Sequence, residues 1–245
     1  DVSGLNILNI LRVIKKETFL LINDGGFPAT TKRFSQKIRW NLVGNKCFGV
    51  ITAGEIGNKY MQAWGFPPEK IYNSYLSHDI KAFTSYRDSE LGDIERRMVR
   101  DSLKIDNGST LVLCNSRLLD WKRIEDLYGS IYYVSEKARN KMFLLLLGDG
   151  NHKEPLNNLL KLNSIRFKWI PSVSYNEVMK YHLASDIFVL PSEGDIWGLV
   201  VNEALSMGKP VICTNKIGAS QLVKNEWNGF KISARDPKAL AISLE

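Results

Sequence analysis

Short apolar runs alternate with longer amphipathic segments along most of the chain, and this alternation predicts the fold. Each run is a few residues long and rich in Val, Ile, Leu and Phe, as expected of parallel strands covered on both faces. The segments between them are long enough for the helical crossovers that parallel strands require. In the second part of the chain the pattern predicts strands at residues 110–114, 142–147, 165–169, 187–190, 211–213 and 230–232.

The first part follows the same pattern less completely. It predicts strands at residues 18–22, 47–52 and 70–72, and helices at 31–42 and 53–64. A highly charged segment, 89–104, is predicted to be a linker helix with Ser89 as its N-cap. We place the domain boundary at residue 106, which gives a partial N-terminal Rossmann-like domain with its linker helix (1–106) and a nearly complete C-terminal one (107–245). Such a chain is expected to be an internal piece of a larger two-domain enzyme.

Composition narrows the class of protein. The hydrophobic content of 44% is ample for a packed core, and the longest apolar run, residues 142–147, is the length of a strand rather than of a membrane span. Three scattered cysteines and the absence of a leader sequence favour a reducing, cytoplasmic setting. The net charge of +7 favours a polyanionic partner, although solvated helix faces explain most basic clusters of this kind. No nucleic-acid recognition motif is present, so nucleic acid is not a predicted partner.

The segment from Asp186 to Glu203 concentrates the candidate chemistry. An apolar run ends at Pro191, and Gly198 precedes a segment whose spacing fits a buried helix. Ligands of open parallel sheets bind beyond the carboxyl ends of strands, where helix N-termini offer free N–H groups to phosphate. The segment also carries three carboxylates near this position, Glu193, Asp195 and Glu203. This layout is typical of a nucleotide-sugar site.

The same segment resembles a known family. Residues 191–212, P-S-E-G-D-I-W-G-L-V-V-N-E-A-L-S-M-G-K-P-V-I, are similar to the signature of the retaining glycosyltransferases of family 4 (glycosyl transferases group 1), which have the GT-B fold. That signature has two glutamates separated by seven residues. Counting back from Glu203 gives Asp195, so this chain has aspartate in the first position, and Glu193 breaks the spacing. The likeness extends over residues 110–233 and implies a GT-B-like α/β fold of two Rossmann-like domains with parallel sheets, the N-terminal one incomplete.

The resemblance also implies roles for individual residues. Asp195 would contact hydroxyls of the donor sugar, and Glu203 those of the nucleotide ribose. The diphosphate would be held by Arg117 and Lys122 and by backbone N–H groups of the segment Gly198, Leu199 and Val200. Ser172 lies where the family's backbone holds the nucleobase, and Asp24 where a polar residue faces the donor sugar. Structural roles are alternatives for several of these residues. Arg117 and Lys122 could be solvated charges in a loop, Asp24 could stabilise a turn, and Trp169 could be a core residue.

The function implied is a hexosyltransferase that moves a sugar from a nucleotide-diphosphate donor to an acceptor hydroxyl with retention of configuration, in polysaccharide or glycolipid biosynthesis. The acceptor would be a glycan or a lipid-linked glycan, and an anionic membrane surface is a candidate partner on the cytoplasmic side. No cofactor beyond the donor and no metal are expected, and His78, His152 and His182 lack metal-ligand spacing. The alternatives are a nucleotide-sugar epimerase, a phosphorylase or a non-catalytic relative. The chain alone is expected to be inactive. Base, sugar, acceptor and linkage are left open, as is the effect of aspartate at position 195.

Overall fold

The described residues form two compact units. The computed structural model describes residues 20–23, 42, 48–151 and 165–245. One unit comprises residues 1–76 with 195–197, and the other comprises residues 77–194 with 198–245. The predicted helix at 31–42 and the candidate Asp24 lie outside the described residues.

The first unit contains a three-stranded parallel sheet in the order β1-β2-β3. Its strands are β1 (Leu20–Asn23), β2 (Gly49–Ala53) and β3 (Ile71–Ser74), each within two residues of a predicted strand. Helix α3 (Gly54–Ala63) follows β2, and the short 3₁₀ helix η2 (Pro68–Lys70) precedes β3. Val50, Met61 and Phe66 are buried together and form a small core, because the apolar face of α3 packs beside the central strand.

The second unit contains a six-stranded parallel sheet in the order β6-β5-β4-β7-β8-β9. All six predicted strands are confirmed, two of them with identical bounds. The strands are β4 (Thr110–Asn115), β5 (Met142–Leu147), β6 (Arg166–Ile170), β7 (Ile187–Leu190), β8 (Val211–Thr214) and β9 (Gly229–Ile232). Within this sheet the first strand in sequence is β4. The next two, β5 and β6, are added on one side of it, and β7 then pairs with β4 on the other side. The direction of winding therefore reverses between β4 and β7, which is where open α/β sheets bind their ligands.

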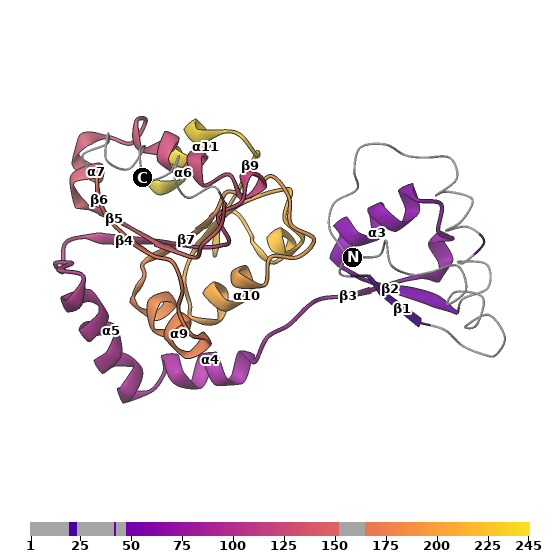
Figure 1. Cartoon of the computed structure of the whole chain (residues 1–245), viewed down its shortest axis with the longest axis horizontal. Coiled ribbons are helices and arrows are strands. Elements are labelled where there is room, and N and C mark those ends of the chain that lie inside the picture. The colour runs from indigo at the N-terminus through magenta and orange to yellow at the C-terminus, as the bar shows by residue number, and fades with distance from the viewer. Residues whose placement is uncertain (1–19, 24–41, 43–47, 152–164) are drawn as a thin grey trace. The chain divides into compact units, whose positions relative to one another are not determined.

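Helices cover both faces of this sheet (Figure 1). On one side lie α6 (Ile124–Ile131), α7 (Glu136–Lys141) and α11 (Pro237–Leu244), and the main core lies between them and the strands. On the other side lie α4 (Ile80–Arg87), α5 (Glu90–Ser102), α9 (Tyr175–Ala184) and α10 (Leu199–Ser206). Two further 3₁₀ helices are η3 (Asp120–Lys122) and η4 (Gly218–Leu222). Within the described ranges no helix combines the length and apolar character that crossing a bilayer would need.

The division between the units falls at residues 76 and 77, not at the predicted boundary of 106. The difference arises because α4 and α5 pack against α10 and α9 of the second unit. Helix α5 itself is confirmed, and the Ser89 side chain caps it by accepting a hydrogen bond from the Gly92 N–H at 3.0 Å. A charged, amphipathic segment was expected to link two domains, but its packing assigns it to one of them.

Two of the three cysteines lie in the sheet of the second unit. Cys114 in β4 and Cys213 in β8 are buried and unpaired. Burial raises the pKa of each thiol to about 12, so both remain protonated at neutral pH. These two residues therefore behave as small apolar core side chains.

Lys209 is expected to make a contribution to the stability of the second unit that grows as pH rises above about 8. Its Nζ donates a hydrogen bond to the Leu183 carbonyl at 2.8 Å, and burial lowers its pKa to about 8, with the charge of Arg96 adding to the shift. An unfolded lysine titrates at about 10.4. Between those values residue 209 binds more protons in the unfolded chain than in the folded one, so its contribution to the free energy of unfolding increases as pH rises.

Urea unfolding at pH 7.5 and pH 9.5 measures this effect. Buried Cys114 and Cys213 lower the free energy of unfolding over the same range, because an unfolded thiol ionises at about pH 8.5 while the buried thiols stay protonated. This effect is common to the wild type and Lys209→Gln, so the measured quantity is the difference in stability between them. That difference should shift in favour of the wild type between pH 7.5 and pH 9.5. Equal changes in the wild type and the variant would contradict the role given to Lys209.

Candidate functional site

The loops that follow β4 and β7 meet at the point where the sheet reverses direction. β4 and β7 are hydrogen-bonded neighbours, so their carboxyl ends lie side by side. The Trp121 carbonyl, in the segment after β4, accepts hydrogen bonds from the Glu193 N–H at 2.8 Å and from the Ser192 hydroxyl at 3.1 Å. Thr214, at the end of β8, donates to the Ser192 carbonyl at 2.5 Å. The loops of three adjacent strands are thereby joined into one surface.

Arg117 and Lys122 both lie on this surface. Arg117 is exposed two residues beyond β4, and Lys122 is half-buried in η3. The charge of Lys122 lowers the pKa of Cys114 against the larger raising effect of burial, so its ammonium lies near the end of β4. The two cations therefore lie at the carboxyl end of β4.

A close contact between two loops supports the Arg117 segment. The Leu118 N–H donates to the Asp149 carbonyl at 3.0 Å, in the turn after β5. A Cβ added to Gly148 would lie 2.0 Å from the Ser116 carbonyl oxygen, and one added to Gly150 would lie 2.1 Å from that of Leu118. Side chains are therefore excluded at both glycines. The G-D-G sequence, interpreted as a simple turn, also holds the loop that carries Arg117.

Helix α10 begins beside the same surface. Gly198 precedes it with φ of 85°, a left-handed conformation that favours glycine. The N–H groups of Leu199 and Val200 belong to the first turn of α10, where no residue of the helix can accept their hydrogen bonds. The half-buried Asp195 precedes this turn, and residues 195–197 group with the first unit. The arrangement in the second unit thus consists of cations at the end of β4 and, at the start of α10, N–H groups that have no acceptor within the helix.

Glu203 lies farther along α10 and is buried, with 7% of its surface exposed. Its Oε2 atom lies 3.4 Å from Nε2 of His182, which is in the last turn of α9 and fully buried. His78 lies near the same carboxylate: burial lowers the pKa of His78, and the negative charge of Glu203 partly opposes that shift. Burial likewise raises the pKa of Tyr175, and Glu203 adds to the effect. Helices α4, α9 and α10 therefore surround one buried carboxylate.

Glu193 has a structural partner. Its carboxylate accepts two hydrogen bonds from the Arg235 guanidinium, at 2.9 and 2.7 Å. This ion pair holds down its pKa and joins the loop after β7 to the segment after β9. The spacing of the signature excludes Glu193 from the predicted donor site. Its ion pair with Arg235 instead joins two loops of the second unit.

Ser172 and Trp169, the remaining candidates, belong to the edge strand β6 and the loop that follows it. Ser172 is exposed two residues beyond β6, and β6 is three strand spacings from β7, about 14 Å. Trp169 is half-buried against the main core, and its indole N–H donates to the Gly148 carbonyl at 2.8 Å. That hydrogen bond favours the core interpretation of Trp169. Across the described part of the chain, no group of His, Cys, Asp and Glu side chains could hold a metal ion.

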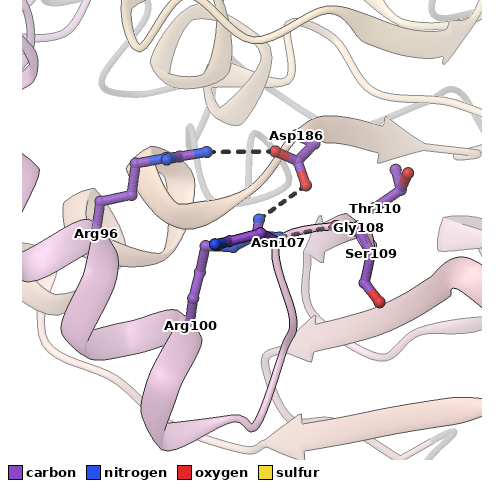
Figure 2. Close-up of a pocket in the computed structure, with 7 residues that line it drawn as sticks. All are labelled: Arg96, Arg100, Asn107, Gly108, Ser109, Thr110 and Asp186. Atoms are coloured by element: carbon purple, nitrogen blue, oxygen red, sulfur yellow. Dashed lines mark hydrogen bonds and ion pairs between the residues drawn. The ribbon is translucent and has the colours of Figure 1, made fainter.

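A polar pocket lies at the amino ends of the strands, away from the carboxyl ends that carry Arg117 and Lys122 (Figure 2). It lies at the amino ends of β4 and β7 and is lined by Arg96, Arg100, Asn107, Gly108, Ser109, Thr110 and Asp186. Arg100 is buried there, and its guanidinium donates to Asp186 at 2.8 Å and to the Ser109 carbonyl at 2.7 Å. Because protein acceptors already occupy these donors, and because ligands bind at carboxyl ends, this pocket is structural rather than a donor site.

Three site neighbours escaped prediction from the sequence: His182, Trp121 and Arg235. Each acts through a contact between segments far apart in the chain, such as α9 with α10. The Trp121 contribution is a backbone carbonyl, which no side-chain pattern reveals. For His182 the sequence shows only a histidine in a predicted helix, and most histidines of that kind have no functional role.

Comparisons with known proteins agree with this geometry. The sequence profile of the family described as glycosyl transferases group 1 matches residues 95–245. An uncharacterised glycosyltransferase of Methanocaldococcus jannaschii is 26% identical over 153 residues, covering 62% of this chain and 39% of that protein. The N,N'-diacetylbacillosaminyl-diphospho-undecaprenol alpha-1,3-N-acetylgalactosaminyltransferase of Campylobacter jejuni is 25% identical over 220 residues, covering 89% of this chain and 56% of that protein.

Among solved structures, HepE from Anabaena in complex with UDP matches with a TM-score of 0.83 at 20% identity. The match covers 97% of this chain and 65% of HepE. The predicted GT-B-like fold class is confirmed. Since the family profile covers more than half of the chain, the chain belongs to the glycosyl transferases group 1 family. It spans about half or less of the length of the curated relatives described above.

Proposed function

We propose that the protein to which this chain belongs transfers a sugar from a nucleotide-diphosphate donor to an acceptor hydroxyl, with retention of configuration. One observation carries this proposal. Arg117 and Lys122 lie at the carboxyl end of β4, beside the loop that leads into α10, in a chain of the glycosyl transferases group 1 family. Cations and helix N–H groups at the reversal point of a parallel sheet suit a diphosphate.

Breaking the bond between sugar and diphosphate develops negative charge on the leaving phosphate. Fixed positive charges near that phosphate stabilise the transition state more than the ground state. In the proposed site Arg117, Lys122 and the N–H groups of Leu199 and Val200 supply this stabilisation, so neither metal nor cofactor is required. Asp195 contacts hydroxyls of the donor sugar, and Glu203 accepts hydrogen bonds from the ribose.

The names of relatives support a particular donor and acceptor class. HepE has been solved with UDP and with UDP-glucose, and the Campylobacter jejuni relative is named for a diphospho-undecaprenol acceptor. We propose a uridine diphosphate sugar as donor and a glycan or lipid-linked glycan as acceptor. The enzyme would then act in polysaccharide or glycolipid synthesis in the cytoplasm, at the membrane surface that carries the acceptor. This chain alone should not transfer sugar, because it spans only part of its relatives.

The proposal predicts that this chain binds a nucleoside diphosphate without a divalent metal. Isothermal titration with UDP, GDP and ADP in the presence of EDTA tests it, and UDP should bind most tightly. Arg117→Ala should weaken binding about tenfold, because a hydrogen bond to a charged group contributes about 1.5–3 kcal/mol.

Arg97→Ala is the matched control, since Arg97 is exposed on α5 and does not lie on the surface that carries Arg117. Its affinity should stay within about twofold of the wild type. Binding that requires Mg²⁺, or equal losses in the two variants, would contradict the proposed diphosphate site.

A further inference from the structure

A cluster of buried polar atoms surrounds Glu203. Seven buried side-chain nitrogen or oxygen atoms of the described residues lack a hydrogen-bond partner, and five of them belong to His78, His182 and Glu203. Buried polar groups are almost always hydrogen-bonded in native proteins, because leaving them unpaired costs free energy. This concentration within one cluster therefore indicates a polar function at this place.

His182 is the most buried member of the cluster. It is 0% exposed, and its ring lies 5.2 Å from that of Phe188, centre to centre. An apolar side chain would fill this position without the cost of burying two ring nitrogens. The nitrogen nearest to a partner is Nε2, which lies 3.4 Å from Oε2 of Glu203. The histidine is thus placed where its chemistry acts on one atom of one carboxylate.

A neutral imidazole carries one N–H donor, and a carboxylate can accept several hydrogen bonds. With the proton on Nε2, His182 points a donor at Oε2. The distance of 3.4 Å is longer than an ordinary hydrogen bond, and functional hydrogen bonds of this kind shorten when the ligand is bound. Such a contact fixes the plane of the Glu203 carboxylate and leaves its other lone pairs for further hydroxyl donors.

We propose that His182 is a positioning residue: its Nε2–H holds the Glu203 carboxylate in the orientation that accepts hydrogen bonds from the ribose hydroxyls of the donor nucleotide. This rests on the ribose-binding role of Glu203 in the proposed function. His78 belongs to the cluster from the segment before α4, and its ring packs edge-to-face with that of Phe83, 4.6 Å away centre to centre. The affinity for the ribose thereby depends on a residue that does not touch the nucleotide.

The test uses the whole 245-residue chain and a matched pair of ligands, UDP and 2′,3′-dideoxy-UDP, with the GDP and ADP pairs run in parallel. The dideoxy ligand has neither ribose hydroxyl that Glu203 would bind. His182→Leu replaces the N–H donor with an apolar side chain. It should weaken UDP binding about tenfold and leave 2′,3′-dideoxy-UDP binding within about twofold of the wild type. His182→Gln, which carries an N–H donor at a similar distance from the backbone, should restore UDP affinity to within about threefold.

Leu183→Ala is the control for packing damage. Leu183 is the next residue of α9, is buried, and packs with Phe83 and Met207. The substitution should lower the thermal midpoint and should affect the binding of UDP and 2′,3′-dideoxy-UDP equally. His182→Leu affecting both ligands equally, or His182→Gln failing to rescue, would overturn the positioning role.

Glu203→Gln, measured with the same ligands, separates this inference from the proposed function. If Glu203→Gln weakens UDP binding but His182→Leu does not, the positioning role is wrong and the ribose site stands. If neither substitution changes UDP affinity, both the ribose site and the positioning role are wrong.

Discussion

Replacing Glu203 with glutamine is expected to weaken UDP binding by about 100-fold. The carboxylate is buried and can accept hydrogen bonds from both ribose hydroxyls. Glutamine keeps one acceptor oxygen but places an NH₂ group where the other hydroxyl, or His182, also donates. Losing hydrogen bonds to a charged acceptor costs about 1.5–3 kcal/mol each, and a loss of about 2.7 kcal/mol corresponds to 100-fold in affinity.

Isothermal titration of the chain with UDP measures the effect, and Glu193→Gln is the matched control. Glu193 belongs to the same segment, but its carboxylate pairs with Arg235 at the surface. Its substitution should change UDP affinity by less than about twofold. Equal losses in the two variants would contradict the spacing argument that chose Glu203 over Glu193. A UDP affinity unchanged by Glu203→Gln would remove the ribose site from the proposal.

The strands could be predicted because burial on both faces leaves a direct mark on the sequence. The segments 142–147 and 187–190 are almost wholly apolar, and their bounds in the structure match the prediction. The order of the strands is not written in any one segment. It depends on which strands pair across the sheet, and the reversal between β4 and β7 is visible only from that pairing.

The candidate site could be predicted only as far as local patterns reach. Gly198, Asp195 and Glu203 lie within one segment, so the resemblance of that segment to the family signature predicted them together. The contact of His182 with Glu203 joins two helices, and the hydrogen bonds to the Trp121 carbonyl join two loops. Contacts of this kind depend on packing between helices and loops, for which a single sequence carries no periodic signal.

The domain boundary was misplaced for a related reason. Charge and amphipathicity predicted a helix at 89–104, and α5 confirms it. They did not show against which unit this helix would pack. Arg100 supplies the answer, because its guanidinium reaches Asp186, the residue before β7 (Figure 2). A side chain interpreted from sequence as part of a basic cluster is a buried link between α5 and the sheet.

Replacing Arg100 with leucine is therefore expected to lower the free energy of unfolding by about 3–5 kcal/mol, because three carbonyls and one carboxylate oxygen lose the donor that satisfies them, at about 1–3 kcal/mol for each buried acceptor left unpaired. The guanidinium donates to Asp186 at 2.8 Å and to carbonyls of Ala184, Asp106 and Ser109 at 3.2, 3.3 and 2.7 Å. For a unit of this size the thermal midpoint should fall by about 10 °C. Differential scanning calorimetry and urea unfolding measure both quantities.

Arg97→Leu is the matched control, because Arg97 lies on the exposed face of the same helix and the substitution changes helix propensity equally. It should change stability by less than about 0.5 kcal/mol. The double variant Arg100→Leu with Asp186→Leu should lose less stability than the sum of the single variants, because each single loss already includes the interaction between Arg100 and Asp186. If the losses of the single variants simply add, the two side chains have no coupling energy, and their ion pair is not what joins α5 to the sheet.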